Sequence, residues 1–248
     1  MEKLDYNILA IVGSNNPKSY TYKITKELLE RIKKEKFNFS IEIIFLHDYD
    51  IKYCHGCMNC FNRGFCPLDQ EDEFNIIKEK LHRSDIIIFS TPVYAHALPG
   101  IMKSFIDRIS SSLHLLEYAG KLGFTVTTTE GNGQEVVSKY IRGLQSGLGI
   151  KNLDNFIFAR LKNEFKSFIE SSSSDFIKRV EDNYGYSNDL LEDSFIFFKK
   201  MFTGVHEDIE LYQSLKNKYE CNYWNQRWIQ ECDSFQEFAR KNRKINVK

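Results

Sequence analysis

Four cysteines lie close together in the first third of the chain. They are Cys54, Cys57, Cys60 and Cys66, with the spacing C-x2-C-x2-C-x5-C. Four thiolates in so short a segment can converge only on something small, and both a four-iron (4Fe-4S) cluster and a zinc ion accept four thiolates. Structural zinc sites usually pair two C-x2-C arms across a longer insertion, which this pattern lacks. The spacing therefore favours the cluster, while zinc, a reversible disulfide and free thiols stay open as alternatives.

Two further cysteines, Cys221 and Cys232, lie far downstream. They share a stripe with Trp224 and Trp228, at steps of three, four and four residues. Such steps place all four side chains on one face of a helix. Because free cysteine often behaves as a small buried hydrophobe, we expect these two thiols to pack in a core rather than to bind a metal.

Three polar loops follow apolar runs and could hold a ligand. The first, residues 14–21, carries hydroxyl groups into the start of a helix, where free backbone amides favour an anion such as phosphate. An ordinary capped loop is the alternative. The second loop covers residues 91–96 and the third covers residues 130–134. Neither a nucleoside-triphosphate P-loop motif nor a dinucleotide fingerprint occurs in the sequence.

These loops belong to a repeating order of strands and helices. Five short apolar runs, which we interpret as buried strands, cover residues 6–12, 40–46, 86–89, 123–129 and 153–159. Amphipathic helical patterns separate them, including one that begins at Pro99-Gly100 and continues to Leu113. This alternation predicts a three-layer α/β sandwich with a parallel sheet. Ligands bind such sheets at the carboxyl ends of the central strands, where the loops lie. Asp107 and Arg108 are expected to form a structural pair.

The sequence changes character at Lys162. Residues 171–174 form a polar break, and the remainder is helical in pattern, with a second apolar stripe at Leu191, Phe195, Phe198 and Phe202. We therefore predict a domain at residues 1–161 and a helical C-terminal extension at residues 162–248. Both apolar stripes should pack on the domain or on a second subunit.

Composition excludes several functions. The chain has 34 Lys and Arg residues and 34 Asp and Glu residues, so it carries no net charge that would attract nucleic acid. The sequence contains no run of 18 apolar residues, so no membrane span is predicted. The start of the chain does not resemble a signal peptide. We expect a cytoplasmic protein, in which clustered cysteines serve metal or redox chemistry.

Three motifs in this order resemble the NADPH-dependent FMN reductase group of flavodoxin-like proteins. They are Gly13-Ser14 with Ser19 and Thr21, the cysteines running into Pro67-Leu68-Asp69, and Thr91-Pro92-Val93-Tyr94 with Gly100, Lys103 and Phe105-Ile106-Asp107-Arg108. The cysteine spacing is similar to that of the iron–sulfur flavoproteins. The resemblance covers about residues 5–160 and implies a five-stranded parallel sheet in the order 2-1-3-4-5. It also implies an FMN at the carboxyl edge of that sheet.

The resemblance implies roles for all three loops. The FMN phosphate would bind the first loop, at Ser14, Asn16, Ser19, Tyr20 and Thr21. The isoalloxazine ring would lie against Pro92, Val93, Tyr94, Ala95 and His96. Its other edge would be held by Glu130, Gly131, Asn132, Gly133 and Gln134. Relatives often carry Arg where Asn16 stands, so we expect either weaker binding of the phosphate here or help from Lys18.

We interpret the chain as an FMN-dependent oxidoreductase of the iron–sulfur flavoprotein type. No side chain is expected to act as a nucleophile because the flavin carries the chemistry, although His96 could tune the ring. NAD(P)H or ferredoxin would donate electrons to a small-molecule acceptor. The protein would be a homodimer or homotetramer, in which the C-terminal extension builds a subunit interface and shelters the flavin edge. One alternative is a cluster-free NAD(P)H-dependent FMN or quinone reductase with zinc or redox thiols. The other is an FMN electron carrier or sensor without turnover.

Overall fold

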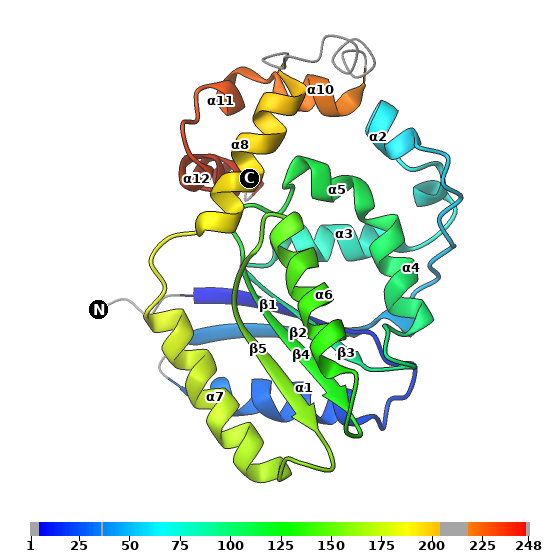
Figure 1. The fold of residues 1–248 in the computed structure, drawn as a ribbon, viewed down its shortest axis with the longest axis vertical. Helices are drawn as coiled ribbons and strands as arrows, with labels where there is room; N and C mark the ends of the chain where they lie inside the picture. Colours follow the sequence, from blue (N-terminus) through cyan, green and yellow to red (C-terminus); the bar gives the residue numbers. More distant parts are fainter. Residues whose placement is uncertain (1–4, 36, 204–217, 247–248) are drawn as a thin grey trace.

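A parallel β-sheet forms the centre of the protein. The computed structural model describes residues 5–35, 37–203 and 218–246. The strands are β1 (Asp5–Val12), β2 (Asn38–Phe45), β3 (Ile86–Pro92), β4 (Leu122–Thr129) and β5 (Lys151–Ala159). They pair in parallel in the order β2-β1-β3-β4-β5 (Figure 1). The predicted fold class and strand order are therefore confirmed.

Helices cover both faces of this sheet. On one face, α1 (Tyr20–Ile32) packs beside α7 (Phe165–Glu181) over an apolar core. The other face is covered by α3 (Phe74–Arg83), α4 (Gly100–Arg108) and α6 (Gln134–Gly147), which enclose a second core. Ile86 to Phe89 in β3 are completely buried between these layers. An uninterrupted apolar run is the pattern expected of a strand covered on both faces.

Two predictions about helices were wrong in detail. The serines at 171–174 do not interrupt α7, because Ser173 Oγ donates to the Ile169 carbonyl at 2.6 Å and small side chains suit its contact with α1. The helix predicted to run from residue 100 to Leu113 is two helices, α4 and α5 (Ser110–Leu115). Ile109 separates them, since its ψ of 5° departs from helical geometry.

The helices after α7 form a separate cap, which we call the helical cap. It comprises α8 (Asp189–Phe202), α10 (Tyr219–Trp224), α11 (Arg227–Gln230) and α12 (Phe235–Asn246). Leu191, Phe195, Phe202 and Trp224 are buried together in its core, and the thiols of Cys221 and Cys232 are buried as predicted. Much of the apolar surface attributed to a subunit interface is therefore covered within the chain.

The helical cap lies at the amino edge of the sheet (Figure 1). Asn242 Nδ2 donates to the carbonyls of Glu117 and Ala119, just before β4, at 3.0 Å each. Arg243 pairs with Asp85, just before β3, at 2.7 Å. The candidate ligand loops leave the opposite edge. Within one chain, the polar contacts of the helical cap thus attach it to the end of the strands away from these loops, so any shelter that it gives a flavin stays a prediction.

The cysteine segment follows β2 on the α3 and α4 side of the sheet. It contains the short helix α2 (Asn59–Arg63) between the 3-10 helices η1 (Leu46–Asp48) and η2 (Pro67–Gln70). α2 reaches across to contact α10 of the helical cap. Within the described ranges, no helix has the length and apolar character that crossing a membrane would require.

Candidate functional site

The three predicted ligand loops meet at the carboxyl edge of the sheet. A depression of about 360 Å³ lies between the loops after β1, β3 and β4. It is lined by nine of the predicted residues, Ser14, Asn16, Ser19, Tyr20, Thr21, Pro92, Val93, Tyr94 and Glu130. Lys18, Thr128, Thr129 and Arg160 complete the lining. Residues far apart in the sequence converge here because parallel strands end at a common edge.

One end of the depression lies at the start of α1. Ser19 caps α1, where its Oγ accepts a hydrogen bond from the Tyr22 amide at 3.2 Å. Ser14 Oγ accepts from the Asn16 amide at 3.3 Å, and Asn16 Oδ1 accepts from the Lys18 amide at 2.9 Å. The loop is thereby held beside the start of a helix, whose free amides favour negative charge. Hydroxyl groups, amides and a lysine are thus available to bind phosphate.

Thr21 makes a different contact from the one expected. Its side chain is buried, and its hydroxyl lies 2.6 Å from that of Thr128 at the end of β4. This contact fastens the first turn of α1 to the neighbouring strand. The structure therefore gives Thr21 a role in positioning the loop at the depression.

Sequence reasoning missed one cation at this site. Arg160 follows β5 directly, and its Nε lies 2.6 Å from Glu130 Oε2. Its guanidinium also lies 5.8 Å from the centre of the Tyr20 ring. Arg160 thus supplies a positive charge that Asn16 does not. Its position directly after a predicted strand could have identified Arg160 from the sequence, because residues at such positions lie at the same edge of the sheet as the other loops.

The second loop has a constrained backbone. Val93 donates its amide to the Thr128 carbonyl at 2.9 Å, and Tyr94 and Ala97 bond to each other through their backbones. Between them, Ala95 and His96 have φ values of 49° and 61°. This left-handed region costs roughly 1–2 kcal/mol for each residue with a side chain, and such strain concentrates at ligand sites. The loop therefore presents a fixed, half-exposed surface that includes the Tyr94 ring.

The third loop lies against the second. Gly133 has a φ of 77°, and a Cβ there would come within 2.9 Å of Val93 and 3.0 Å of the His96 imidazole. A glycine is needed for both reasons. Thr129 Oγ1 donates to the Asn132 carbonyl at 2.6 Å, and Gly131 lies beside Leu161. The Gln134 Oε1 atom is buried without a hydrogen-bond donor among the described residues.

The four clustered cysteines border a separate cavity of about 450 Å³. Cys54 and Cys57 are exposed, Cys60 and Cys66 are half-buried, and none is disulfide-bonded. The chain bends around this cavity at Gly56, Met58 and Gly64, which all have positive φ. Across residues 5–35, 37–203 and 218–246, no three Cys, His, Asp or Glu side chains lie close enough together to hold a metal ion. The four cysteines thus match a cofactor with four thiolate ligands in their number and in lining one cavity. Their sulfur atoms do not converge on one point in this structure.

Arg108 anchors both ends of this segment. Its buried guanidinium donates to the Lys52 carbonyl at 3.1 Å before the cysteines, and to Asp69 at 2.8 Å and to Asp72 after them. Burial alone would lower the pKa of Arg108, but the hydrogen bond to Asp72 and the neighbouring negative charges outweigh it and raise that pKa. The expected Asp107–Arg108 pair does not form, because Asp107 bonds to Lys103 on the exposed face of α4.

The surroundings of the thiols shift their pKa values in different directions. The pKa of Cys57 is lowered because the backbone amide and the side chain of Asn59 donate hydrogen bonds to its sulfur, the latter at 3.3 Å. The pKa of Cys60 is raised, chiefly by burial. Burial also raises the pKa of Cys221 and of Cys232, whose thiols donate to the carbonyls of Phe202 and Trp228.

Helix α4 connects the two sites. Lys103 lines a groove with His96 and Leu98 at the carboxyl edge. One turn later, Asp107 lines the cysteine cavity. The Lys103–Asp107 ion pair therefore lies between the candidate ligand loops and the thiols.

Comparison with known proteins agrees with this geometry. The family described as NADPH-dependent FMN reductase matches residues 6–161. An iron-sulfur flavoprotein of Archaeoglobus fulgidus is 40% identical over 103 residues, which are 41% of this chain and 47% of that protein. One from Clostridioides difficile is 32% identical over 132 residues, 53% of this chain and 58% of that protein. The chain thus spans about half the length of these curated relatives.

Solved structures agree on the fold. An FMN-dependent NADH-azoreductase from Bacillus anthracis, solved with FMN, superimposes with a TM-score of 0.52 at 13% identity. The superposition covers 72% of this chain and 99% of the azoreductase. The family match covers more than half of the chain, and the sheet order and edge loops agree with it. The protein is therefore a member of the NADPH-dependent FMN reductase family.

Proposed function

We propose that this protein is an FMN-dependent oxidoreductase of the iron–sulfur flavoprotein type. The observation that carries the proposal is the meeting of three loops at the carboxyl edge, around a helix start rich in hydroxyl groups and amides. FMN, when bound, supplies hydride and electron transfer through its ring. The protein's part is to bind, orient and partly enclose that ring.

The phosphate of FMN would be held at the start of α1. Ser14, Asn16 and Ser19 would offer polar side chains, with the backbone of Tyr20 and Thr21 adding amides. Arg160 and Lys18 would balance the charge, in place of the arginine that relatives often carry at position 16. Arg160 would exchange part of its contact with Glu130 for the phosphate.

The flavin ring would lie against residues 92–96 and 130–134. The strained turn at Ala95 and His96 holds this surface before any ligand binds, which lowers the entropy lost on binding. Gln134 fits the same role, because its buried Oε1 atom has no donor among the described residues and could accept one from a ring N–H. The His96 imidazole, packed near Gly133, is placed to tune the ring.

Cys54, Cys57, Cys60 and Cys66 would hold a 4Fe-4S cluster, which supplies one-electron transfer. Four thiols around one cavity and a buried anchor at Arg108 support this. NAD(P)H or ferredoxin would then deliver electrons for a small-molecule acceptor. Six free thiols, two of them exposed, suit the reducing conditions of the cytoplasm.

A second candidate is a cluster-free reductase of the same family. The specific observation in its favour is that the described thiols do not converge, while Cys57 has a lowered pKa suited to thiol chemistry. In both candidates the exposed apolar side chains of Leu190, Ile196 and Phe197 on α8 offer a surface for a homodimer or homotetramer.

Purification without oxygen, followed by flavin, iron and sulfide assays, tests the proposal. One FMN per chain with about four iron and four sulfide ions is expected. Flavin with zinc or with no metal would favour the second candidate. A protein that neither releases flavin on denaturation nor binds added FMN would rule out both.

A further inference from the structure

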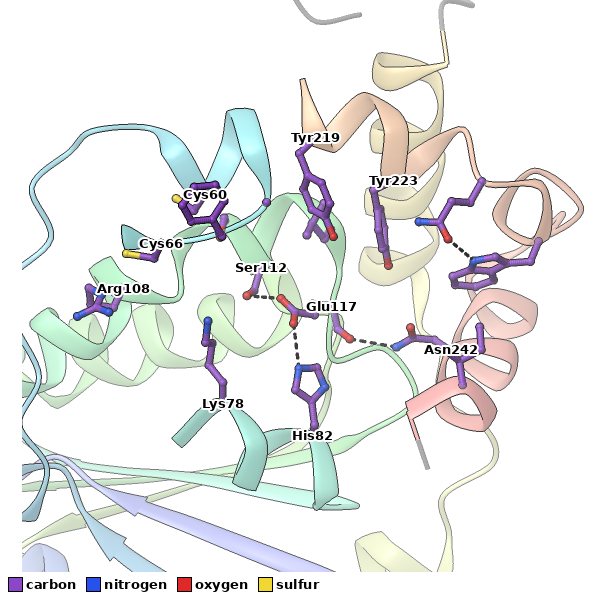
Figure 2. Close-up of a pocket in the computed structure, with 17 residues that line it drawn as sticks. Cys60, Cys66, Lys78, His82, Arg108, Ser112, Glu117, Tyr219, Tyr223 and Asn242 are labelled. Atoms are coloured by element: carbon purple, nitrogen blue, oxygen red, sulfur yellow. Dashed lines mark hydrogen bonds and ion pairs between the residues drawn. The ribbon is translucent and has the colours of Figure 1, made fainter. Parts of the chain in front are cut away.

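A second cavity lies where the cysteine segment, α5 and the helical cap meet (Figure 2). Its volume is about 270 Å³, just below the range of about 300–1,000 Å³ that is typical of small-molecule sites. Cys60 and Cys66 line one side, and Tyr219 and Tyr223 of α10 line another. None of the residues around the carboxyl-edge depression takes part. The cavity therefore suits a small ligand other than the flavin.

Two phenol groups face this space. Figure 2 shows the rings of Tyr219 and Tyr223 side by side, with both hydroxyl groups directed toward Glu117 and Ser112. Neither hydroxyl has a hydrogen-bond partner among the residues that the structure describes. Burial, with a smaller contribution from the charge of Glu117, raises the pKa of both phenols. Both are therefore protonated at neutral pH and available as donors.

The wall opposite the phenols carries an acceptor that already has two donors. Glu117 accepts from Ser112 Oγ at 2.5 Å and from the His82 imidazole at 3.0 Å. Burial alone would raise the pKa of Glu117, but these hydrogen bonds outweigh it and lower the pKa, so the group is a carboxylate. A ligand that offers an acceptor can therefore bind to the phenols in place of water.

The charges at the cavity disfavour an anion. Lys78 pairs with Asp69 at 2.5 Å, and Arg108 is neutralised by Asp69 and Asp72. The Glu117 carboxylate is paired with the His82 imidazole, and Lys78 adds a weaker electrostatic attraction. A carboxylate or phosphate ligand would thus meet the negative charge of Glu117, while Lys78 and Arg108 are already paired with aspartates.

Aromatic surface completes the site. Trp228 lines the cavity together with Tyr219 and Tyr223, and its indole nitrogen is already bonded to Gln226 at 2.9 Å. Gly64 lies under Tyr219, so close that a Cβ there would be 2.5 Å from the ring. This glycine fixes the phenol against the cysteine segment. Rings of this kind stack favourably on another ring.

We propose that this cavity binds a small, uncharged aromatic carbonyl compound, whose oxygen accepts hydrogen bonds from Tyr219 and Tyr223 beside Cys60 and Cys66. The site exists only because α10 lies over the cysteine segment. It would bring the ligand next to the thiols, on a side of the protein distant from the residues proposed to hold FMN. Binding there requires no electron transfer and no flavin.

Calorimetric titration of the full-length protein with acetophenone tests this proposal. Acetophenone has one ring and one carbonyl oxygen, and it neither adds to thiols nor readily accepts electrons. We expect saturable binding at one site per chain. Tyr219→Phe and Tyr223→Phe should each raise the dissociation constant about threefold to tenfold, because a hydrogen bond is lost while the ring remains. The double variant should raise it further. Tyr184→Phe removes an exposed hydroxyl elsewhere and should bind as the unaltered chain does.

The ligand class has its own control. Benzoate, which replaces the ketone by a carboxylate, should bind at least about tenfold more weakly than acetophenone, and Glu117→Gln should narrow that difference. Absence of binding, or equal affinity in the double tyrosine variant, would overturn the proposal. Stronger binding of benzoate would overturn the ligand class. Flavin content is measured separately on the same samples, so a failure here leaves the proposed FMN site untouched.

Discussion

The carboxyl-edge loops and the cysteine segment are both candidate cofactor sites, but they are built differently. The loops are held at many points by the sheet and by one another, as in the Thr21–Thr128 contact and the Val93–Thr128 hydrogen bond. The cysteine segment is anchored at its ends by Arg108 and touches α10 through α2, while Cys54 and Cys57 remain exposed. A parallel sheet creates the first site by its topology, whereas we expect the second to gain its final geometry from what it binds.

Loss of one thiol should separate the two sites most clearly, through the iron content of the protein. Cys60→Ala should remove most of the iron while leaving flavin content unchanged, because a four-thiolate site loses one of its ligands and the edge loops lose nothing. Iron, sulfide and flavin assays on anaerobically purified protein provide the measurement. Cys221→Ala is the matched control, since that buried thiol should not affect metal content. Equal iron in both variants would refute the ligand assignment.

Removing the anchor should have the next largest effect. Arg108→Met leaves the carboxylates of Asp69 and Asp72 without their buried partner, and breaking such a pair costs roughly 3–5 kcal/mol. The free energy of unfolding, measured in urea, should fall by that amount, and metal content should fall with it. Arg83→Met, which breaks an exposed pair on α3, should change neither. An undiminished metal content would mean that the segment orders itself without Arg108.

The phosphate end of the edge site should respond more moderately. Replacing Ser14 and Ser19 together by Ala should weaken FMN binding, since each hydrogen bond to a charged group contributes roughly 1.5–3 kcal/mol. Titration of the flavin-free protein with FMN gives the dissociation constant. Ser171→Ala, on the exposed face of α7, is the control. An unchanged constant would place the phosphate elsewhere.

Arg160 should have a smaller effect. Arg160→Gln is expected to weaken FMN binding about twofold to fivefold, because this side chain is half-exposed and water screens its charge. The effect should shrink further at high salt. Arg31→Gln removes a similarly exposed arginine that pairs with Glu170, and should not change FMN affinity. Equal constants for both variants, at low salt, would exclude Arg160 from the site.

The smallest effect concerns the order in which the thiols ionise. The pKa of Cys57 is lowered and that of Cys60 is raised, so Cys57 becomes a thiolate first as pH increases. In metal-free protein, alkylation by iodoacetamide should therefore reach half its maximal rate at a lower pH for Cys57 than for Cys60. Mass spectrometry of digested samples resolves the two. The reverse order would show that the hydrogen bonds from Asn59 do not stabilise the Cys57 thiolate in solution.

The amino-acid sequence by itself determined the sheet and the position of its edge loops. Buried parallel strands require continuous apolar runs. Ile86 to Phe89 form such a run, and the structure buries all four residues as predicted. The residues that follow such runs must emerge at the carboxyl edge. The sequence alone therefore predicted that Ser14, Val93 and Glu130 lie close together. These features depend on local pattern and on the fixed handedness of strand–helix–strand connections.

Only the tertiary structure decided the contacts between segments remote in the sequence. Arg160 reaches Glu130 across the sheet edge, and Arg108 joins Lys52 to Asp72 through a buried guanidinium. The cap's attachment to the amino edge depends on hydrogen bonds from Asn242, and the cavity beside Cys60 depends on where Tyr219 then lies. An apolar stripe predicts that a helix will be buried, but it does not say against what. Its partner is set by the shape and the free polar groups of surfaces that exist only once the chain has folded.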